Sequence, residues 1–195
     1  ISTNFFEDTR IYSSCFFTAD SAFNRKEWVS PENTEISTCK SFKYNDNDQL
    51  YQADVTRYQT GYESYSIFCY DSLGRIGKQQ FYYEDNLESY ILYTYDYAGN
   101  LIRQEKYIEN DDDIASLSNS TVYFFDEKHN PYKAFYSLLT PGKYTNTNNI
   151  IKEVYTLYSD VDGTVDDVMV WETNYEYNEL GYPVRQNGEF EFIYR

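Results

Sequence analysis

Acidic side chains are the most abundant groups in this chain that can do chemistry, but only one short run has a spacing that suggests a specific ligand. Asp160, Asp162 and Asp166 alternate around Gly163, as in part of a calcium-binding loop. The run lacks a further oxygen ligand before the glycine and the bidentate Glu that completes such a loop. An Asp-Gly hairpin turn explains the same residues, so calcium is the less favoured interpretation.

Catalytic machinery is hard to assemble from the remaining residues. His129 is the only histidine, so a Ser-His or Cys-His pair has a single candidate base. The sequence contains no G-x-S-x-G, H-E-x-x-H or phosphate-binding glycine loop, and nothing in it implies a cofactor. The 32 acidic residues supply candidates for paired-carboxylate chemistry on glycans without favouring any one pair. We therefore expect no enzymatic activity.

The two tryptophans are the candidate ligand-binding residues. Trp28 lies near an expected turn, and Trp171 lies in a segment with alternating apolar residues. A flat aromatic ring can stack on a sugar or on a partner side chain. For Trp171 the alternation favours packing in the core over ligand contact.

Charge excludes some partners. The formal net charge of −16, with scattered basic residues, argues against binding to nucleic acid and to anionic membrane surfaces. The chain has no long apolar run, and Glu172, Asn174 and Glu176 place polar groups on one face of an expected strand, so a membrane-spanning chain is not expected. Cys15, Cys39 and Cys69 predict buried small residues, or one disulfide with a spare thiol, rather than a metal site.

An internal repeat organises the chain. Five segments share the pattern aromatic-x-aromatic-[Asp/Asn]-x-x-Gly-x-[Leu/Ile/Pro], and the second, third and fifth copies have Gly at its seventh place. Their second aromatic residues are Tyr44, Tyr70, Tyr95, Phe125 and Tyr177, which gives steps of 26, 25, 30 and 52 residues. The last step is twice 26, so an eroded copy is expected around residues 155–163.

Each copy predicts a hairpin bend. An Asp or Asn such as Asp71, Asp96 or Asn178 accepts backbone hydrogen bonds and favours a type I turn. A residue at positive φ three places later then returns the chain through a bulge. Gly74, Gly99 and Gly181 suit that place, and Asp48 and His129 stand there in the two remaining copies, which are the first and the fourth. His129 is thereby predicted to have a structural role.

The bends predict an all-β fold. We expect an antiparallel up-and-down meander of about a dozen strands in a single domain, as a strongly curved sheet or an open or partly closed barrel. Residues 1–40 are expected to be less regular, and 41–195 to hold the hairpins. Short helices are considered near 20–28 and within 110–117. Residues Met169 to Tyr177 are expected to form one strand, paired with a strand that contains Phe190, Phe192 and Tyr194.

The segments Tyr70–Ile76 (YDSLGRI) and Tyr95–Leu101 (YDYAGNL) resemble YD repeats of the rearrangement-hotspot family. That family forms large hollow shells or extracellular arrays. This chain is too short to close a shell and has no Asp-Pro core motif, so the resemblance does not imply enclosure of a toxin. Its short, tyrosine-rich form is similar to secreted lipoproteins of Bacteroidetes with degenerate YD hairpins. That similarity implies an outer-envelope or secreted location, with a lipid-bearing Cys upstream of Ile1.

Two functions follow as hypotheses. The first is a secreted or envelope-anchored binding module, because 24 tyrosines spread over both faces of a sheet offer a broad surface for a glycan or an envelope protein. The alternative is a structural spacer derived from a longer YD array, and a glycan-active enzyme is less favoured. The sequence does not indicate an oligomeric state.

Overall fold

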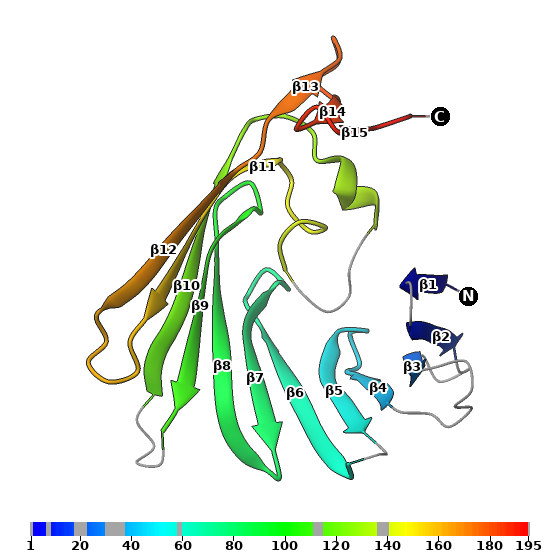
Figure 1. Ribbon diagram of the computed structural model, residues 1–195, viewed down its shortest axis with the longest axis vertical. Helices are drawn as coiled ribbons and strands as arrows, with labels where there is room; N and C mark the ends of the chain where they lie inside the picture. Colours follow the sequence, from blue (N-terminus) through cyan, green and yellow to red (C-terminus); the bar gives the residue numbers. More distant parts are fainter. Residues whose placement is uncertain are drawn as a thin grey trace. The chain divides into compact units, whose positions relative to one another are not determined.

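The computed structural model describes the backbone of residues 2–6, 9–17, 23–29, 38–57, 60–110, 115–135 and 141–194. Side chains are described from Lys40 onward within these ranges, except those of Ala134 and Phe135. The described residues form fifteen strands and one short 3₁₀ helix (Figure 1). No helix among them has the length and hydropathy needed to span a bilayer.

The first twelve strands form one sheet in which neighbours in sequence are neighbours in space. They are β1 (Ser2–Phe6), β2 (Thr9–Phe17), β3 (Phe23–Val29), β4 (Thr38–Tyr44), β5 (Leu50–Arg57), β6 (Tyr62–Tyr70), β7 (Ile76–Tyr83), β8 (Asn86–Tyr95), β9 (Leu101–Glu109), β10 (Ala115–Phe125), β11 (Ile150–Tyr158) and β12 (Val165–Glu172). The helix η1 (Pro131–Phe135) lies between β10 and β11. The strand order begins at β1 and ends at β12, which confirms the antiparallel meander and leaves it unclosed.

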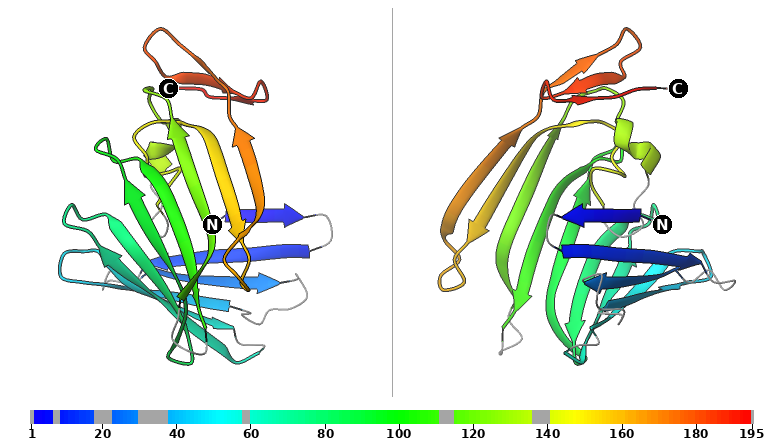
Figure 2. Two further views of the ribbon diagram at one scale, coloured as in Figure 1. Left: turned by 90° about the vertical axis from the view of Figure 1, so that its left-hand side faces the viewer. Right: turned by 45° about the vertical axis from the view of Figure 1, so that its right-hand side comes forward.

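A second, small sheet consists of β13 (Tyr175–Tyr177), β14 (Pro183–Gln186) and β15 (Phe190–Glu191). Figure 2 shows these strands grouped beyond the end of β12. The expected single strand from Met169 to Tyr177 is therefore wrong, because the chain changes sheets at Thr173 and Asn174. The Asn174 N–H donates to Asn187 Oδ1 (2.8 Å), and Asn187, at a φ of 52°, returns a hydrogen bond to the Asn174 carbonyl. Phe190 consequently pairs with β14.

The chain divides into two compact units, so we describe each by itself. Unit 1 comprises Ile1–Cys69 and Gln79–Glu88, and unit 2 comprises Tyr70–Lys78 and Ser89–Arg195. That the two form a single domain stays a prediction. Of the short helices considered, the one near 20–28 is replaced over Phe23–Val29 by β3, whose backbone pairs with β2. Residues 115–117 begin β10, while 111–114 lie outside the described residues.

The cores of the two units differ in chemistry. Among the described side chains of unit 1, the buried apolar ones are Phe42, Leu50, Ala53 and Phe68. In unit 2 Leu101 is fully buried, but so are three asparagines, namely Asn100, Asn146 and Asn149. Buried amides must find hydrogen-bond partners, so much of the interior of unit 2 is a polar network.

Four of the predicted bends have the expected geometry. In the bends that begin at Asn45, Asp71, Asp96 and Asn178, the first residue accepts a hydrogen bond from the residue three places later and donates one to the carbonyl four places later. The residues three places later, Asp48, Gly74, Gly99 and Gly181, have φ values of 58°, 75°, 89° and 78°. These are bulged type I hairpins. The acid or amide oxygen also accepts the N–H four places later, as in the 2.8 Å bond from Asn100 to Asp96.

The fourth copy departs from this pattern, and the prediction for His129 is wrong. The only non-glycine residues with positive φ among the described ones are Asp48, Glu84, Asp85 and Asn187. Asp126 still begins a reversal, but its N–H donates to the carbonyl of Asn149 (3.1 Å), 23 residues later. Asn149 and Ile150 thus take the places that Asn100 and Leu101 hold in the preceding bend. His129 belongs to the intervening connection, where its ring stacks on Tyr182 at 4.4 Å.

The eroded copy around 155–163 also forms a reversal. Ser159 replaces the Asp, its N–H donates to the Thr164 carbonyl (2.8 Å), and Gly163 has a φ of 71°. This turn joins β11 to β12 and is one residue longer than the regular bends. Copies of the repeat therefore form the reversals β4–β5, β6–β7, β8–β9, β10–β11 and β11–β12.

Candidate functional site

A cavity of about 320 Å³ in unit 2 is the candidate functional site. One wall is the large sheet, which contributes Gln104 from β9, Tyr123 from β10, and Ile150 and Glu153 from β11. The remaining lining comes from the connection between β10 and β11 and from the chain that enters and forms the small sheet: Asn130, Tyr132, Pro141, Gly142, Lys143, Thr173, Tyr175 and Gln186.

The strand register explains which side chains face the cavity. Tyr123 pairs with Glu153, and Glu153 pairs with Trp171 on β12, so these three lie on one face of the sheet. The same face continues to Thr121, Tyr155 and Met169 one step along each strand. Because side chains alternate between the two faces of a strand, this register places Tyr123 and Glu153 together at the cavity wall.

Asn130 holds the connection in place over the sheet. Its Nδ2 donates to the carbonyls of Lys143 (2.7 Å) and Asn146 (2.9 Å), while its Oδ1 accepts the Tyr132 N–H (2.9 Å). These bonds join the start of η1 to the returning segment 141–149. They fix the backbone positions from which Tyr132 and Lys143 enter the cavity.

Tyr132 is the residue that ties the cavity walls together. Its hydroxyl donates to Gln186 Oε1 of β14 at 2.5 Å, and its ring meets Phe192 edge-on at 5.6 Å. Lys143 Nζ lies over the same ring, 3.6 Å from its centre. Such a cation–π contact holds the ammonium at the cavity wall without neutralising it.

The cavity holds one carboxylate with a raised pKa. Burial raises the pKa of Glu153, because burial disfavours the charged form, and Lys143 acts in the opposite direction. Among the described residues no hydrogen bond or ion pair engages this carboxylate. Burial also raises the pKa of Tyr123 to about 12 and that of Tyr175 well above its usual range, with Glu153 adding a like-charge effect in both cases. Both phenols therefore stay neutral donors at physiological pH.

This arrangement is suited to binding. Tyrosine rings supply flat apolar faces, and the unpaired polar atoms include Glu153, Gln104 Oε1 and Gln186 Nε2, none of which is hydrogen-bonded among the described residues. Glu153 is the only carboxylate among the described lining residues.

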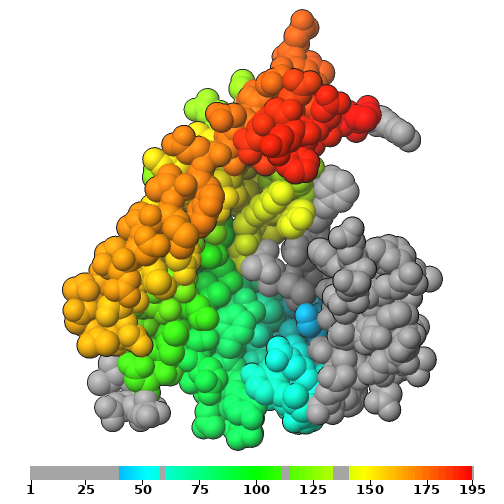
Figure 3. Space-filling model, in the orientation of Figure 1, coloured from blue at the N-terminus to red at the C-terminus, as the bar shows by residue number. Residues whose placement is uncertain are grey.

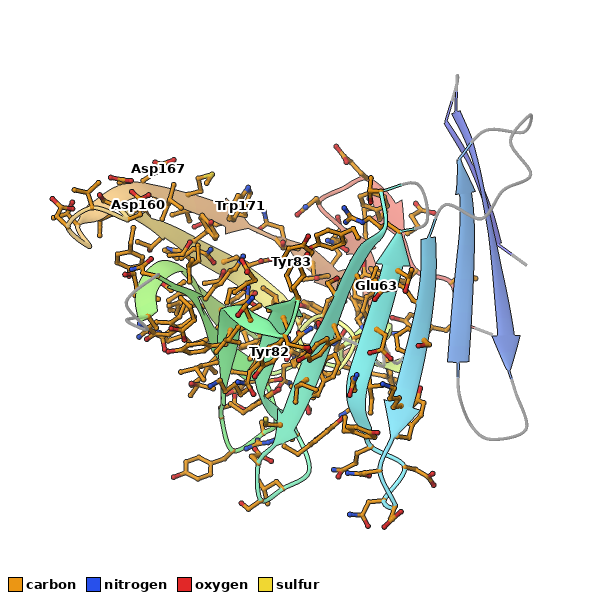
Figure 4. All side chains as sticks on the ribbon, turned by 90° about the horizontal axis from the view of Figure 1, so that it is seen from below. Glu63, Tyr82, Tyr83, Asp160, Asp167 and Trp171 are labelled. Carbon is orange, nitrogen blue, oxygen red and sulfur yellow. The ribbon has the colours of Figure 1, made fainter. Side chains whose placement is uncertain are left out.

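Unit 1 contains a second cavity, of about 370 Å³, with a different lining. Tyr65 and Tyr83 line it, and each is stacked on a further tyrosine, at 4.8 and 4.7 Å respectively. Four acids surround them, namely Asp54, Glu63, Glu84 and Asp85, and no Lys or Arg is among the described lining residues. Figure 4 shows Glu63 and Tyr83 of this group. The acids are solvated or paired, as in the 3.2 Å bond from Tyr65 to Asp85.

The structure does not bring the calcium candidates together. No group of three or more His, Cys, Asp or Glu side chains within the described part of the chain has an arrangement that could hold a metal ion. Asp162 is engaged in its own turn, where Oδ1 accepts the Thr164 hydroxyl (2.7 Å), and this bond lowers the pKa of Asp162. Asp160 and Asp166 are exposed on the same hairpin.

The two tryptophans have different outcomes. Trp171 is 50% exposed, so the expectation of core packing is wrong. It lies on β12, which among the described strands pairs only with β11, and its ring meets Tyr155 edge-on at 6.4 Å. It stands beside Glu153 but does not line the cavity. The side chain of Trp28, in β3, lies outside the described residues.

The cysteines are settled only in part. Cys69 is a free, exposed thiol, which fits the spare-thiol alternative and not the buried one. The side chains of Cys15 and Cys39 lie outside the described residues.

Sequence reasoning did not identify the cavity residues. Tyr132 and Lys143 follow no repeat position, and the signal that marks them is the long excursion between Asp126 and Ile150. Gln186 lies outside that excursion, at the end of β14, and no signal in the sequence marks it. That excursion is rich in Asn and Thr at 145–149, which are the residue types that can satisfy buried backbone groups.

A solved structure shares this fold. A porin-like protein from Bacteroides vulgatus ATCC 8482 superimposes with a TM-score of 0.50 over 95% of this chain and 86% of that chain, at 11% identity. A porin-like protein from Bacteroides uniformis ATCC 8492 gives a TM-score of 0.46, with 10% identity over 98% and 90% of the two chains. No family model matches the sequence, and no curated protein matches it. At such low identity the first likeness shows the fold alone.

Proposed function

We propose that this protein is a non-enzymatic binding module of the bacterial envelope that holds a glycan in the cavity of unit 2. The observation that carries the proposal is the lining of that cavity, where three tyrosines meet unpaired amide and carboxylate oxygens. Sugars present apolar C–H faces and a rim of hydroxyls. A site for them needs flat rings and fixed polar groups in the same enclosure.

Each part of the lining has a role in this proposal. The rings of Tyr123 and Tyr175, which both line the cavity, offer stacking faces, one from the large sheet and one from the small sheet. Glu153 accepts hydrogen bonds from sugar hydroxyls, and Gln186 Nε2 donates one. Lys143 is already held over the Tyr132 ring, so little entropy is lost when a ligand orders it.

The envelope location is the second part of the proposal. A porin-like protein from Bacteroides vulgatus has the same fold, and this supports an envelope location, whether secreted or attached through a lipid on an upstream Cys. Descent from a YD-type array is part of the same proposal. It is supported by four bends that repeat one hydrogen-bond pattern, with a fifth reversal that keeps the anchoring acid.

A glycan array, combined with a pull-down from envelope extracts, tests the proposal. Wild-type protein is expected to bind a limited set of glycans, and Tyr132→Ala is expected to lose that binding by at least about tenfold because the wall between the sheets is removed. Gln104→Ala, which changes only the sheet wall, is a second variant in case Tyr132→Ala folds poorly. Tyr97→Ala is the matched control, since Tyr97 is fully exposed on the β8–β9 bend.

The absence of binding in both the glycan array and the pull-down would overturn the glycan proposal and favour the spacer alternative. Equal binding by wild type, Tyr132→Ala and Gln104→Ala would place the glycan elsewhere on the protein.

A further inference from the structure

The strand β12 is an edge of the large sheet with no further strand beside it among the described residues. It ends the strand order of the large sheet, and all eight of its residues are exposed. Val168, Val170 and Trp171 are each 50% exposed and Met169 is 39% exposed, so a run of four apolar side chains faces solvent on both sides of the strand. In the space-filling view β12 forms a continuous strip in the orange part of the surface (Figure 3). Natural sheets usually blunt such edges with Lys or Pro, and β12 has neither.

One hydrogen bond shows which backbone groups of β12 point outward. The Val168 N–H donates to the side-chain Oδ1 of its own neighbour Asp167 (2.8 Å), so it faces away from β11. Because N–H groups alternate along an antiparallel strand, the Val170 N–H also faces the open edge. The Thr173 N–H, an odd number of residues away, donates inward to the Ile151 carbonyl (2.9 Å), as this alternation requires. The outward groups are those that an added strand would pair.

Acids flank the apolar run at both ends. Asp166 and Asp167 precede it and Glu172 follows it, and β12 carries no Lys or Arg. The base nearest in register is Lys152, which pairs with Glu172 at one end of β11. Figure 4 shows Asp160 near the tip of the hairpin and Asp167 between it and Trp171, so negative charge continues into the turn. Charge complementarity therefore calls for basic residues at both ends of a bound segment.

The same charges disfavour pairing between two copies of β12. In an antiparallel pair centred on Met169, Asp166 would lie opposite Glu172 at both ends, and like charges opposite each other destabilise a sheet. A pair centred on Val168 would place Asp166 opposite Val170. Neither register satisfies the acids, so a second copy is not the fitting occupant.

We propose that β12 receives an extended segment of a partner protein by strand addition, with alternating apolar residues at the centre of the segment and Lys or Arg at each end. Main-chain hydrogen bonds to the outward groups of Val168 and Val170 supply the pairing. When the segment binds, the Asp167 carboxylate releases the Val168 N–H and pairs with the Lys or Arg at one end of the segment. This site is separate from the glycan cavity and does not depend on it.

A labelled peptide, Lys-Val-Thr-Val-Thr-Val-Lys, tests the proposal by fluorescence anisotropy at low salt. We expect binding that weakens at least about tenfold when the end residues are Glu, and that weakens with added salt. N-methylation of alternate amides on one edge of the peptide removes the donors for pairing. Of the two possible edges, methylation of one is expected to abolish binding and methylation of the other to leave it intact.

Two substitutions at one position separate backbone pairing from side-chain contact. Val170→Pro removes an outward N–H, which a proline on an edge strand can lack without loss of pairing to β11. It is expected to weaken peptide binding at least about tenfold, whereas Val170→Thr keeps the donor and the β-branch and stays within about twofold. The triple variant Asp166→Asn, Asp167→Asn and Glu172→Gln is expected to reduce the preference for basic ends.

Several results would overturn the proposal. They are equal binding of the peptides methylated on either edge, full affinity in Val170→Pro, and concentration-dependent self-association in sedimentation that Val170→Pro removes. The last would assign the edge to a second copy. Glycan binding is expected to be unchanged in Val170→Pro, so failure here and failure of the proposed function are distinguishable.

Discussion

Two reversals in unit 2 begin with the same acid and build different structures. At β8–β9, Asp96 is followed by a tight bend, and its carboxylate accepts the Asn100 N–H and side chain at 2.8 and 2.9 Å. At β10–β11, Asp126 makes the equivalent contacts with Asn149, at 3.1 Å from the N–H and at 3.1 and 3.3 Å from Nδ2. In this second reversal, a connection of more than twenty residues separates Asp126 from Asn149.

The two reversals show that the same anchoring acid can close either a tight bend or a long connection. The anchoring acid fixes where β11 starts, so the inserted chain is free to differ in sequence and path. The tight bend exposes Tyr97 at its tip and contributes no residue to the cavity, whereas the long connection supplies Asn130, Tyr132 and Lys143. The Tyr177 hydroxyl also donates a short bond to Asp126, which links the anchor to the small sheet.

The connection docks back onto the tight bend through amides. Asn100 Oδ1 accepts the N–H groups of Thr147 and Asn148, each at 2.9 Å, and Asn146 Oδ1 accepts the Leu101 N–H at 2.8 Å. Asn146 is fully buried there. These contacts explain why the interior of unit 2 is rich in asparagine.

The largest effect is expected when the long connection is made into a tight bend. Replacing residues 127–148 by Ser-Leu-Gly gives Asp126-Ser-Leu-Gly-Asn149-Ile150, which copies the bend from Asp71 to Ile76. We expect the strand spectrum by circular dichroism to persist and glycan binding to fall at least about a hundredfold, because one wall of the cavity is removed. Insertion of two glycines after Val161 is the control, and retained binding in the replacement would contradict the assignment of the site.

Removing Asp126 and Asp96 in separate variants should show which of the two anchoring acids contributes more to the free energy of unfolding. Asp126→Ala is expected to lower the free energy of unfolding by about 2–4 kcal/mol. The substitution leaves the Asn149 N–H, the Asn149 side-chain amide and the Tyr177 hydroxyl without the acceptor that they have in the wild type. Asp96→Ala is expected to cost about 1–3 kcal/mol, because fewer donors lose their partner. Urea unfolding measures both, and a larger loss in Asp96→Ala would show that the tight bend is the stronger anchor.

Gly99→Ala isolates the backbone strain of the tight bend. An added Cβ would meet only Thr147 Oγ1 at 3.8 Å, an ordinary contact, but φ is +89°. The expected cost is about 1–2 kcal/mol, caused by the left-handed conformation and not by crowding. Gly99→Asn, measured in the same urea series, should recover part of the loss because Asn tolerates this region better.

The smallest effect is expected at the cavity carboxylate. Because burial raises the folded pKa of Glu153, the folded protein holds this proton more tightly than the unfolded chain does. Its stability contribution is therefore complete below the unfolded pKa and is lost as pH rises through the folded pKa. Glu153→Gln should raise stability near neutral pH by about 0.5 kcal/mol or less, since the partly exposed group is screened by solvent.

A pH series of urea midpoints tests that sign. The difference between wild type and Glu153→Gln should vanish in acid and grow toward neutral pH, while glycan binding weakens in the variant. A constant difference at all pH values would show that the substitution acts through packing.

The sequence predicted the bends because their determinants are local. An Asp or Asn that accepts its own turn amides and a residue that tolerates positive φ lie within five residues of each other, as from Asp71 to Arg75. The prediction for His129 was wrong because the anchoring acid, Asp126, bonds to a distant residue, Asn149, and not to the residue four places later. The prediction that Trp171 is buried was wrong because its burial depends on whether another strand follows β12 in the sheet. Alternation within one strand does not reveal this.

The chain by itself therefore determined its strand order and bends, since consecutive hairpins place neighbours in sequence side by side. Only the tertiary structure decided where a ligand is held and which edge is open. The cavity needs contacts across 54 residues, such as the one from Tyr132 to Gln186, and such contacts depend on the packing of separate sheets and loops. No short-range pattern of residue types encodes that packing.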